Sequence, residues 1–309
     1  INGVLDFSND TITFDTVFAS IGSITKTLTI YNNNDEDIYS NISIRGNSAA
    51  NFRMNIDGVS GNNQNNVFIP KNDSIFIFIE VTVDPSSNTT PYILSDSLLF
   101  ETGSNLQSVK LVAWGQDAHF YTPNTFGEII NGNDTTKVFY HQISSNQTWS
   151  NEKPHVIYGY VIIDPNATLN ISEGTNVYFH KNSGILVGNP FSNQLGGTLK
   201  VNGNYENEVT FQGDRLDPWY EDIPGQWDRI RFLPGSFDNE INYAIIKNGT
   251  TGIHADTVSN SNPTVTINNT VIKNMSSIGI LGQGAKIEAS NTVVSECGQY
   301  TVACYIGGD

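Results

Sequence analysis

The densest group of chemically versatile side chains lies between Gly213 and Arg229. Aromatic residues on such a loop could stack on sugar rings, and two carboxylates at a set separation could hydrolyse a glycosidic bond. One loop shows neither that separation nor the cation that a lyase would need, so we assign no catalytic residue. The candidate binding residues of this stretch are Asp217, Trp219, Tyr220, Glu221 and Asp222.

The end of this stretch, 225–230, has a structural interpretation. Its letters Gly-Gln-Trp-Asp-Arg-Ile match the strand-initiation pattern Gly-x-Trp-x-x-Ile of non-catalytic β-helix proteins. The pattern predicts that Trp227 is buried against Ile230 or Phe232. The charged residues of the stretch are then expected to pair with each other, as Asp228 could with Arg229, or to bond to backbone groups, because unpaired buried charges are costly; they are Asp214, Arg215, Asp228 and Arg229. The tip, residues 217–222, is expected to remain exposed and to face a partner.

No other arrangement of side chains indicates a reaction. We find no Ser-His-Asp elbow, phosphate loop or dinucleotide fingerprint. Cys297 and Cys304 give neither a disulfide framework nor a zinc pattern, so two core residues and one disulfide both stay open. The histidines have no metal-ligand spacing, and we expect neither a metal nor a cofactor; they are His119, His141, His155, His180 and His254.

Every Asp-Ser or Asp-Thr pair in the chain is followed by an aliphatic residue or by threonine. This pattern resembles the O-glycosylation sequon of the Bacteroidota, which modify exported proteins. It also fits turn-to-strand transitions, and the sequence leaves both interpretations open. The possible O-glycosylation sites are Thr11, Thr16, Ser74, Ser97, Thr135 and Thr257.

The charge of the chain restricts its partners. The net charge is −16, and the 15 basic residues are scattered. Because a phosphate backbone is bound by clustered Lys and Arg, we expect no nucleic acid and no anionic lipid surface as partner. No stretch approaches the ~20 apolar residues of a membrane helix. The start, Ile1-Asn2-Gly3, carries neither signal peptide nor initiator Met and is expected to be a mature or trimmed N-terminus.

The elements that position these side chains are predicted to be all β. Charged residues make up only 15% of the chain, while β-branched and aromatic residues are plentiful. Residues 1–118 contain short strands, such as 23–31 and 74–83, which are separated by polar turn clusters and predict a β-sandwich. With 96–100 and 109–115, these strands resemble the immunoglobulin-like family of abnormal-spindle and hydin proteins. That resemblance implies a structural or adhesive domain without a catalytic set.

A different pattern begins after the first domain. Residues 119–155 give mixed signals and are predicted to be a connector. From 156 to 309, short alternating strands are broken by glycines, which allow tight corners. This succession resembles the opening coils of pectate-lyase-like right-handed parallel β-helices.

Internal repeats support a solenoid independently of that resemblance. Residues 241–248 align with 267–274 at an offset of 26, and 289–296 follow 22 residues later, as one coil of a three-sided solenoid requires. We expect Ile245, Val271 and Val293 to stack as an inward file. The repeated Asn248 and Asn274 are expected to form an asparagine ladder at a coil corner. No polar cap follows the last repeat, so we expect the β-helix to be incomplete at the C-terminus.

The whole layout resembles a family of uncharacterised surface lipoproteins from Bacteroidota, most distinctly at 112–117, 153–159 and 211–215. The resemblance implies export to the cell surface, at the outer membrane, with membrane attachment only through a lipid anchor shortly upstream of Ile1. It supplies location and fold, not an activity.

Two functions follow as hypotheses. The first is a non-enzymatic surface protein that acts as a scaffold, a binding module or an accessory subunit of an outer-membrane protein complex. The alternative is a β-helix that binds or degrades polysaccharide, as a lyase or a hydrolase, with a surface glycan as partner and residues 214–229 as its site.

Overall fold

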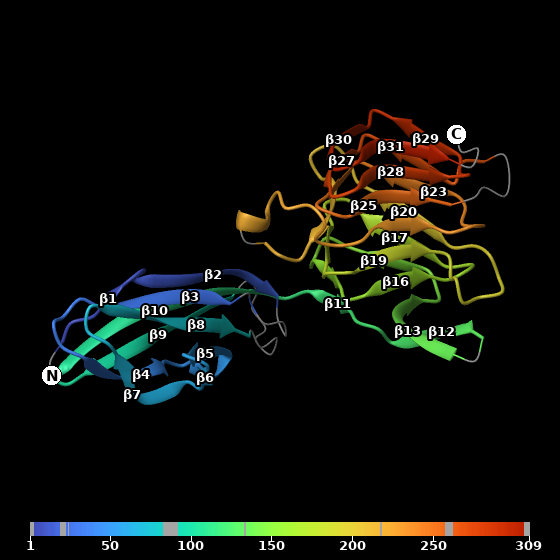
Figure 1. The fold of residues 1–309 in the computed structure, drawn as a ribbon. Coiled ribbons are helices and arrows are strands. Elements are labelled where there is room, and N and C mark those ends of the chain that lie inside the picture. The colour runs from blue at the N-terminus through green and yellow to red at the C-terminus, as the bar shows by residue number, and fades with distance from the viewer. Residues whose placement is uncertain are drawn as a thin grey trace. The chain divides into compact units, whose positions relative to one another are not determined.

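The computed structural model describes residues 3–18, 23, 25–82, 92–132, 134–216, 218–256 and 262–305. Within these residues the chain is all β apart from two short 3-10 helices, η1 (Ala49–Asn51) and η2 (Pro218–Tyr220). The predicted all-β class is therefore confirmed. None of the described helices is long or apolar enough to cross a membrane. The chain divides into two compact units, Ile1–Asp117 and Ala118–Asp309 (Figure 1).

The described residues of the N-terminal unit form two five-stranded sheets. Neighbouring strands are antiparallel except β2 and β10, which run parallel. Sheet I contains, in spatial order, β1 (Asp6–Phe7), β3 (Lys26–Asn32), β8 (Asp73–Val81), β5 (Phe52–Ile56) and β6 (Val59–Ser60). Sheet II contains β2 (Thr11–Phe18), β10 (Asn105–Gln116), β9 (Tyr92–Thr102), β4 (Ile38–Arg45) and β7 (Asn63–Ile69).

Alternation along the strands of this unit builds one shared core. On β8, Ile77, Ile79 and Val81 are buried, whereas Phe78 and Glu80 between them are exposed. Successive side chains of a strand point to opposite faces, so each strand offers one apolar face. The buried residues of both sheets form a single hydrophobic cluster.

Asp96 on β9 interrupts this apolar face. Its side chain is only 5% exposed, and neither carboxylate oxygen has a hydrogen-bond partner among the described residues. Burial raises the pKa of Asp96 above its ordinary value, and a weak interaction with the Ser48 backbone amide opposes this effect only in part. Gly46 lies directly against it, because a Cβ built at Gly46 would come within 1.6 Å of the Asp96 Oδ1 atom. The core of the N-terminal unit thus contains a carboxyl group for which the described residues offer neither an ion-pair partner nor a full hydrogen bond.

Within its described part, the C-terminal unit is built from three sheets in which the strands pair in parallel except in the β12–β13 hairpin. Sheet III contains β11 (His119–Tyr121), β15 (His155–Ile157), β18 (Asn176–Phe179), β21 (Val209–Gly213), β24 (Ala244–Lys247), β27 (Val271–Met275) and β30 (Val293–Cys297). Sheet IV contains β12 (Thr125–Asn131), β13 (Asp134–Ile143), β16 (Tyr160–Ile163), β19 (Gly184–Val187), β22 (Ile230–Phe232), β25 (Thr251–Ala255), β28 (Ile278–Gln283) and β31 (Tyr300–Tyr305). Sheet V contains β14 (Gln147–Trp149), β17 (Thr168–Ser172), β20 (Thr198–Asn202), β23 (Asn239–Asn242), β26 (Val265–Asn268) and β29 (Ile287–Ser290).

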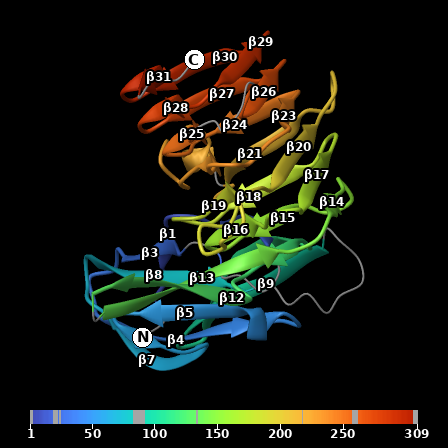
Figure 2. The ribbon, with the colours of Figure 1, turned by 90° about the vertical axis from the view of Figure 1, so that its right-hand side faces the viewer.

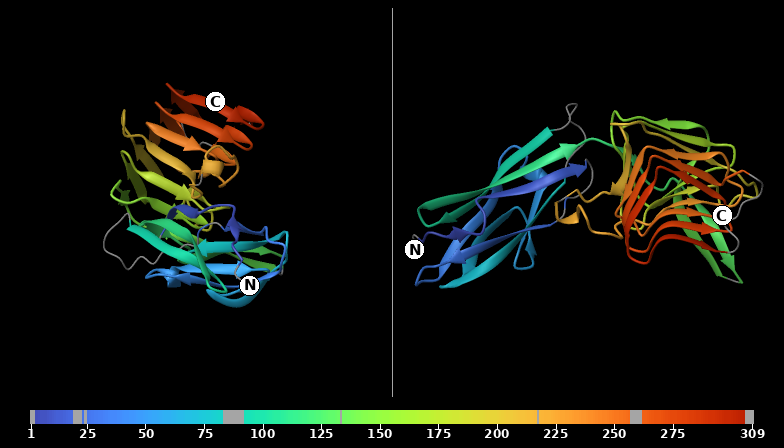
Figure 3. Two further views of the ribbon diagram at one scale, coloured as in Figure 1. Left: turned by 90° about the vertical axis from the view of Figure 1, so that its left-hand side faces the viewer. Right: turned by 90° about the horizontal axis from the view of Figure 1, so that it is seen from above.

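The chain visits sheets III, IV and V in turn, so each passage forms one coil. Figure 2 shows the coils stacked in sequence order from β15 to β31, and the right-hand view of Figure 3 looks onto the last coil of the stack. Buried side chains from all three sheets fill one core. This arrangement is compatible with a parallel β-helix.

The stretch predicted to be a connector, 119–155, belongs to this unit. Strand β11 pairs with β15, β13 with β16, and β14 with β17, so these residues form the first strands of all three sheets. Strands β11 and β14 have only three residues each, which is too short for an alternation of apolar and polar residues to be recognised in the sequence.

The repeat alignment predicted correctly which residues of sheet III pair with each other. It was wrong about which face of the sheet they lie on. Ile245 pairs with Val271, and Val271 pairs with Val293. These side chains are half-buried or exposed, however, and therefore do not form the inward file. The core is contacted instead by the residue that comes next in the sequence after each of these three. These inward residues are Ile246, Ile272 and Val294.

The predicted asparagine ladder is confirmed between two coils. Asn248 and Asn274 both adopt a positive φ, 66° and 57°, at equivalent corners. The Asn274 side-chain amide donates a hydrogen bond of 2.8 Å to the Asn248 side-chain oxygen. Asn248 is only 3% exposed, so its neighbour in the next coil satisfies a buried polar group.

Candidate functional site

The loop 214–227 leaves sheet III after β21 and ends where the chain reaches sheet IV. It carries η2, which is the short golden helix that projects from the coils in Figure 1. At its far end Trp227 is 1% exposed, and its indole nitrogen donates to the Lys247 carbonyl at 2.9 Å. The predicted burial of Trp227 is confirmed, but its stacking partner is Phe179 of the preceding coil, with ring centroids 4.2 Å apart.

Hydrogen bonds from buried or half-buried amides hold the backbone of this loop. The Gln226 side chain donates to the carbonyls of Tyr220 and Ile223 at 2.7 and 2.8 Å. The Asn248 amide that takes part in the ladder donates to the Glu221 carbonyl at 2.8 Å. Because these amides come from the loop base and from the next coil, the tip of the loop is fixed to the body of the unit.

The side chains of the predicted binding residues have different environments on this fixed backbone. Trp219 is 78% exposed, and Glu221 and Asp222 are also exposed. Tyr220 is half-buried beneath the Arg215 guanidinium, which lies 3.9 Å from its ring centroid. Such a cation–π contact contributes about 0.5–1 kcal/mol at an exposed site. Asp217 lies outside the described residues.

A file of three polar side chains lies at the base of the loop. Tyr158, His180 and Asp214 each follow a strand of sheet III, and the register of β15, β18 and β21 places them at equivalent positions in consecutive coils. The His180 Nδ1 atom lies 2.8 Å from the Asp214 Oδ2 atom, and the Tyr158 and His180 rings stack with centroids 4.5 Å apart. The hydrogen bond to Asp214 raises the pKa of His180, whose side chain is about half exposed.

Residue types alone did not identify this file, because His180 has no metal-ligand spacing and Asp214 stands 34 residues later. The file of Tyr158, His180 and Asp214 could have been predicted only from the register in which the strands of consecutive coils pair. The Ile157–Phe179–Gly213 pairing brings the residue after each strand into one column.

A second polar network begins across the corner, at the start of the sheet IV strands. Asp228 accepts a hydrogen bond from the Tyr160 hydroxyl and pairs with the Arg229 guanidinium, 2.9 Å from Asp228 Oδ1. The predicted pairing of Asp228 with Arg229 is thus confirmed. Arg229 Nη1 also lies 3.2 Å from His254 Nδ1, which connects the pair to the next coil.

His254 links this pair to a second ion pair. Its Nε2 atom lies 3.0 Å from Asp256 Oδ1, and Asp256 also pairs with Arg231 at 2.9 Å. Since an arginine can only donate, His254 Nδ1 is the acceptor and Nε2 carries the proton. Burial would raise the pKa of Asp256, but the hydrogen bonds from His254 and Arg231 outweigh burial and lower the pKa below its ordinary value.

These contacts determine what the region can do chemically. Asp228 and Asp256 are each held by an arginine, and both nitrogens of His254 are engaged, so this network has the character of a structural ion-pair array. No group of three or more His, Cys, Asp or Glu residues in the described part of the chain could hold a metal ion. The exposed part of the site is the loop tip with Trp219, Glu221 and Asp222.

The predicted O-glycosylation sites are scattered over the described strands and do not gather at the loop. Thr11, Ser74 and Ser97 are half-buried on β2, β8 and β9, and Thr135 is exposed on β13. Thr257 and the side chain of Thr16 lie outside the described residues. Both cysteine thiols are free, so the disulfide interpretation is not supported, and Cys304 is exposed and therefore not a core residue.

Comparisons with known proteins leave the family of this chain open. No protein-family model and no curated protein matches it. Among solved structures, a family 123 glycoside hydrolase from Clostridium perfringens is 8% identical with a TM-score of 0.27, over 37% of this chain and 27% of the hydrolase. A protein of unknown function from Porphyromonas gingivalis W83 is 12% identical with a TM-score of 0.27, over 47% of this chain and 58% of that protein. The E. coli chaperone DraB is 9% identical with a TM-score of 0.26, over 44% and 68%. Likenesses of this strength establish neither a shared fold nor a function.

Proposed function

We propose that this chain is a non-enzymatic binding module that docks a protein partner through the tip of loop 214–227. The observation that carries the proposal is the 78% exposed Trp219 on a backbone held by Gln226 and Asn248. Tryptophan, tyrosine and arginine dominate the binding energy of protein interfaces, and a fixed backbone loses little conformational entropy on binding. The tip therefore has the composition and the rigidity of an interface hot spot.

The chemistry of the tip defines the surface that it would fit. Trp219 requires an apolar pocket, and Glu221 and Asp222 beside it favour basic groups around that pocket. Arg215 is already stacked on Tyr220 and would contribute the rim of the contact. A sugar site at this loop would need carboxylates around an aromatic-lined groove, whereas Asp214 is bound to His180.

We further propose the finer fold and location that the sequence indicates. The shared core of sheets I and II supports an immunoglobulin-like sandwich, and the cyclic order of sheets III, IV and V supports a right-handed parallel β-helix. The family resemblance supports a lipid-anchored protein at the outer-membrane surface, where it would act as a scaffold or as an accessory subunit of a membrane protein complex. Protease accessibility on intact cells tests this location.

The docking proposal is tested by quantitative capture of partners from native membranes with the full chain and two variants. We expect Trp219→Ala to reduce capture of a stoichiometric partner by roughly 30-fold, the effect of losing a hot-spot residue. Tyr205→Ala is the matched control, because it removes an aromatic side chain of the same unit that is 74% exposed. Equal capture by both variants would contradict the proposal.

A further inference from the structure

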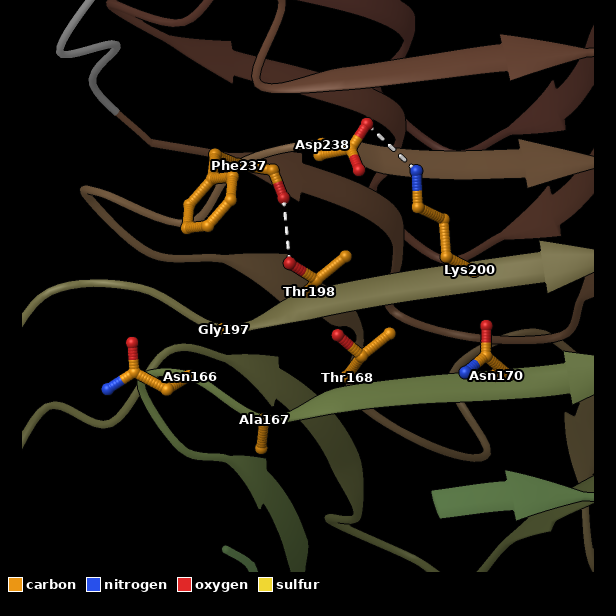
Figure 4. Close-up of a pocket in the computed structure, with 9 residues that line it drawn as sticks. All are labelled: Asn166, Ala167, Thr168, Asn170, Gly197, Thr198, Lys200, Phe237 and Asp238. Carbon is orange, nitrogen blue, oxygen red and sulfur yellow. Dashed lines mark hydrogen bonds and ion pairs between the residues drawn. The ribbon is translucent and has the colours of Figure 1, made fainter. Parts of the chain in front are cut away.

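A hollow on the outer face of sheet V has no role in the proposed docking site. It has a volume of about 290 Å³ and lies over β17 and β20, below the turn that leads into β23 (Figure 4). Alternation along these strands sends Leu199 and Val201 into the core and leaves Thr168, Asn170 and Lys200 on the outer face. The hollow is therefore lined mainly by side chains that face away from the core.

The walls of this hollow combine an aromatic ring with neutral and paired polar groups. Figure 4 shows Phe237 at one end and Lys200 with Asp238 at the other, with Thr168 and Asn170 below. The Phe237 side chain is 53% exposed, so its ring is accessible from solvent beside the hollow. The Lys200 Nζ atom is 2.9 Å from both Asp238 and Glu240.

The turn that carries Phe237 and Asp238 is fixed by buried hydrogen bonds. Asn239, which follows it, is 2% exposed and accepts from the Leu199 amide at 2.8 Å, while its own amide donates to the Thr264 carbonyl at 2.8 Å. The Thr198 hydroxyl donates to the Phe237 carbonyl at 3.0 Å. The backbone that carries the exposed ring and the carboxylate is thus fixed, which reduces the conformational entropy that binding would cost.

We propose that this hollow binds a single ring of a neutral glycan. The face of an aromatic ring packs against the C–H groups of a pyranose, and the Thr168 hydroxyl and Asn170 amide can both donate to and accept from sugar hydroxyls. The Asp238 carboxylate can accept from a further hydroxyl. Because about 290 Å³ lies just below the roughly 300–1,000 Å³ of sites for drug-sized ligands, there is room for one ring.

Charge decides against acidic ligands. The single ammonium of Lys200 faces two carboxylates, Asp238 and Glu240, so the hollow has a surplus of negative charge within a chain of net charge −16. A uronic acid, a sialic acid or a phosphate would be repelled from it. A neutral sugar has no such penalty.

Saturation-transfer NMR with the full chain tests this inference. The probes are the methyl glycosides of glucose, galactose, mannose and N-acetylglucosamine, with glucuronic acid as the acidic counterpart. We expect transfer to at least one neutral glycoside and none to glucuronic acid. Phe237→Ala, at an exposed position, should weaken the neutral ligand roughly tenfold, and Asn170→Ala should weaken it less.

Trp219→Ala separates this inference from the docking proposal, because it removes the exposed aromatic residue of the loop and leaves the hollow intact. Its glycoside affinity should equal that of the unmodified chain. The inference is overturned if no neutral glycoside binds at millimolar concentration, if glucuronic acid binds as well as the neutral sugars, or if Trp219→Ala abolishes binding while Phe237→Ala does not.

Discussion

Asn248 in the C-terminal unit and Asp96 in the N-terminal unit are both almost fully buried polar residues, but only Asn248 has hydrogen-bond partners. Asn248 contacts Asn274 one coil later and the Glu221 carbonyl of the loop. Asp96 has no hydrogen-bond partner within the described residues and keeps a raised pKa through burial. A stack of coils repeats each corner, so a polar side chain meets an equivalent one in the next coil. The two sheets of the N-terminal unit do not repeat, and a lone inward carboxylate therefore stays unpaired.

The strongest test of this difference places a charge in the coil core away from the ladder. Ile272→Asp should lower the free energy of unfolding by about 3–5 kcal/mol, because no neighbouring coil offers a partner for the buried carboxylate. Val271→Asp, on the half-buried outer face, should cost less than about 1 kcal/mol. Denaturant unfolding of the full chain measures both, and similar losses would mean that the inner and outer faces are assigned wrongly.

Removing a ladder residue should have an intermediate effect. Asn248→Ala leaves the Glu221 carbonyl without its donor and the Asn274 amide without its acceptor, which should cost about 1–3 kcal/mol and make loop 214–227 more susceptible to proteolysis. Asn182→Ala is a matched control, since Asn182 also has a positive φ, 61°, but is exposed. Equal losses would attribute the effect to backbone conformation and not to the hydrogen bonds.

The smallest effect is expected at Asp96 and depends on pH. Because the folded-state pKa is raised, the unfolded chain loses the Asp96 proton first as pH rises from about 4, and folding stability falls until the folded state also ionises. Asp96→Asn should therefore be more stable than the unmodified chain by about 1 kcal/mol at pH 7 and equal to it below pH 4. Thermal unfolding across this range measures the difference.

Asp35→Asn controls for net charge, because it removes one negative charge from an exposed position of the N-terminal unit. A pH-dependent gain of equal size in both variants would show that general charge repulsion, and not burial of Asp96, causes the effect.

The sequence predicted the pairing of the coils better than their faces. The repeat of 26 and 22 residues placed Ile245, Val271 and Val293 in register. It could not decide the inward residue, because at each position two aliphatic residues stand side by side and both satisfy an apolar pattern.

The candidate site was predicted in part. The density of acidic, basic and aromatic residues indicated the loop, and the Gly-x-Trp-x-x-Ile pattern at 225–230 indicated the burial of Trp227. The His180–Asp214 contact and the hollow beside Phe237 bring together residues 34 to about 70 positions apart, through coils of unequal length. Without the coil lengths, sequence separation does not predict such contacts.

The backbone bonds at the two ends of loop 214–227 have a consequence for engineering. The Asp214 amide donates to the Phe179 carbonyl, and the Asp228 amide donates to the Ser183 carbonyl, so the preceding coil fixes the chain immediately before and after the loop. At the loop base, Gln226 and Trp227 also bond to the next coil, so the part of the loop that contributes least to coil pairing is the exposed tip around Trp219. This corner is therefore a natural insertion point, where a foreign peptide or a second recognition segment could be grafted and displayed on a rigid support without resetting the stack.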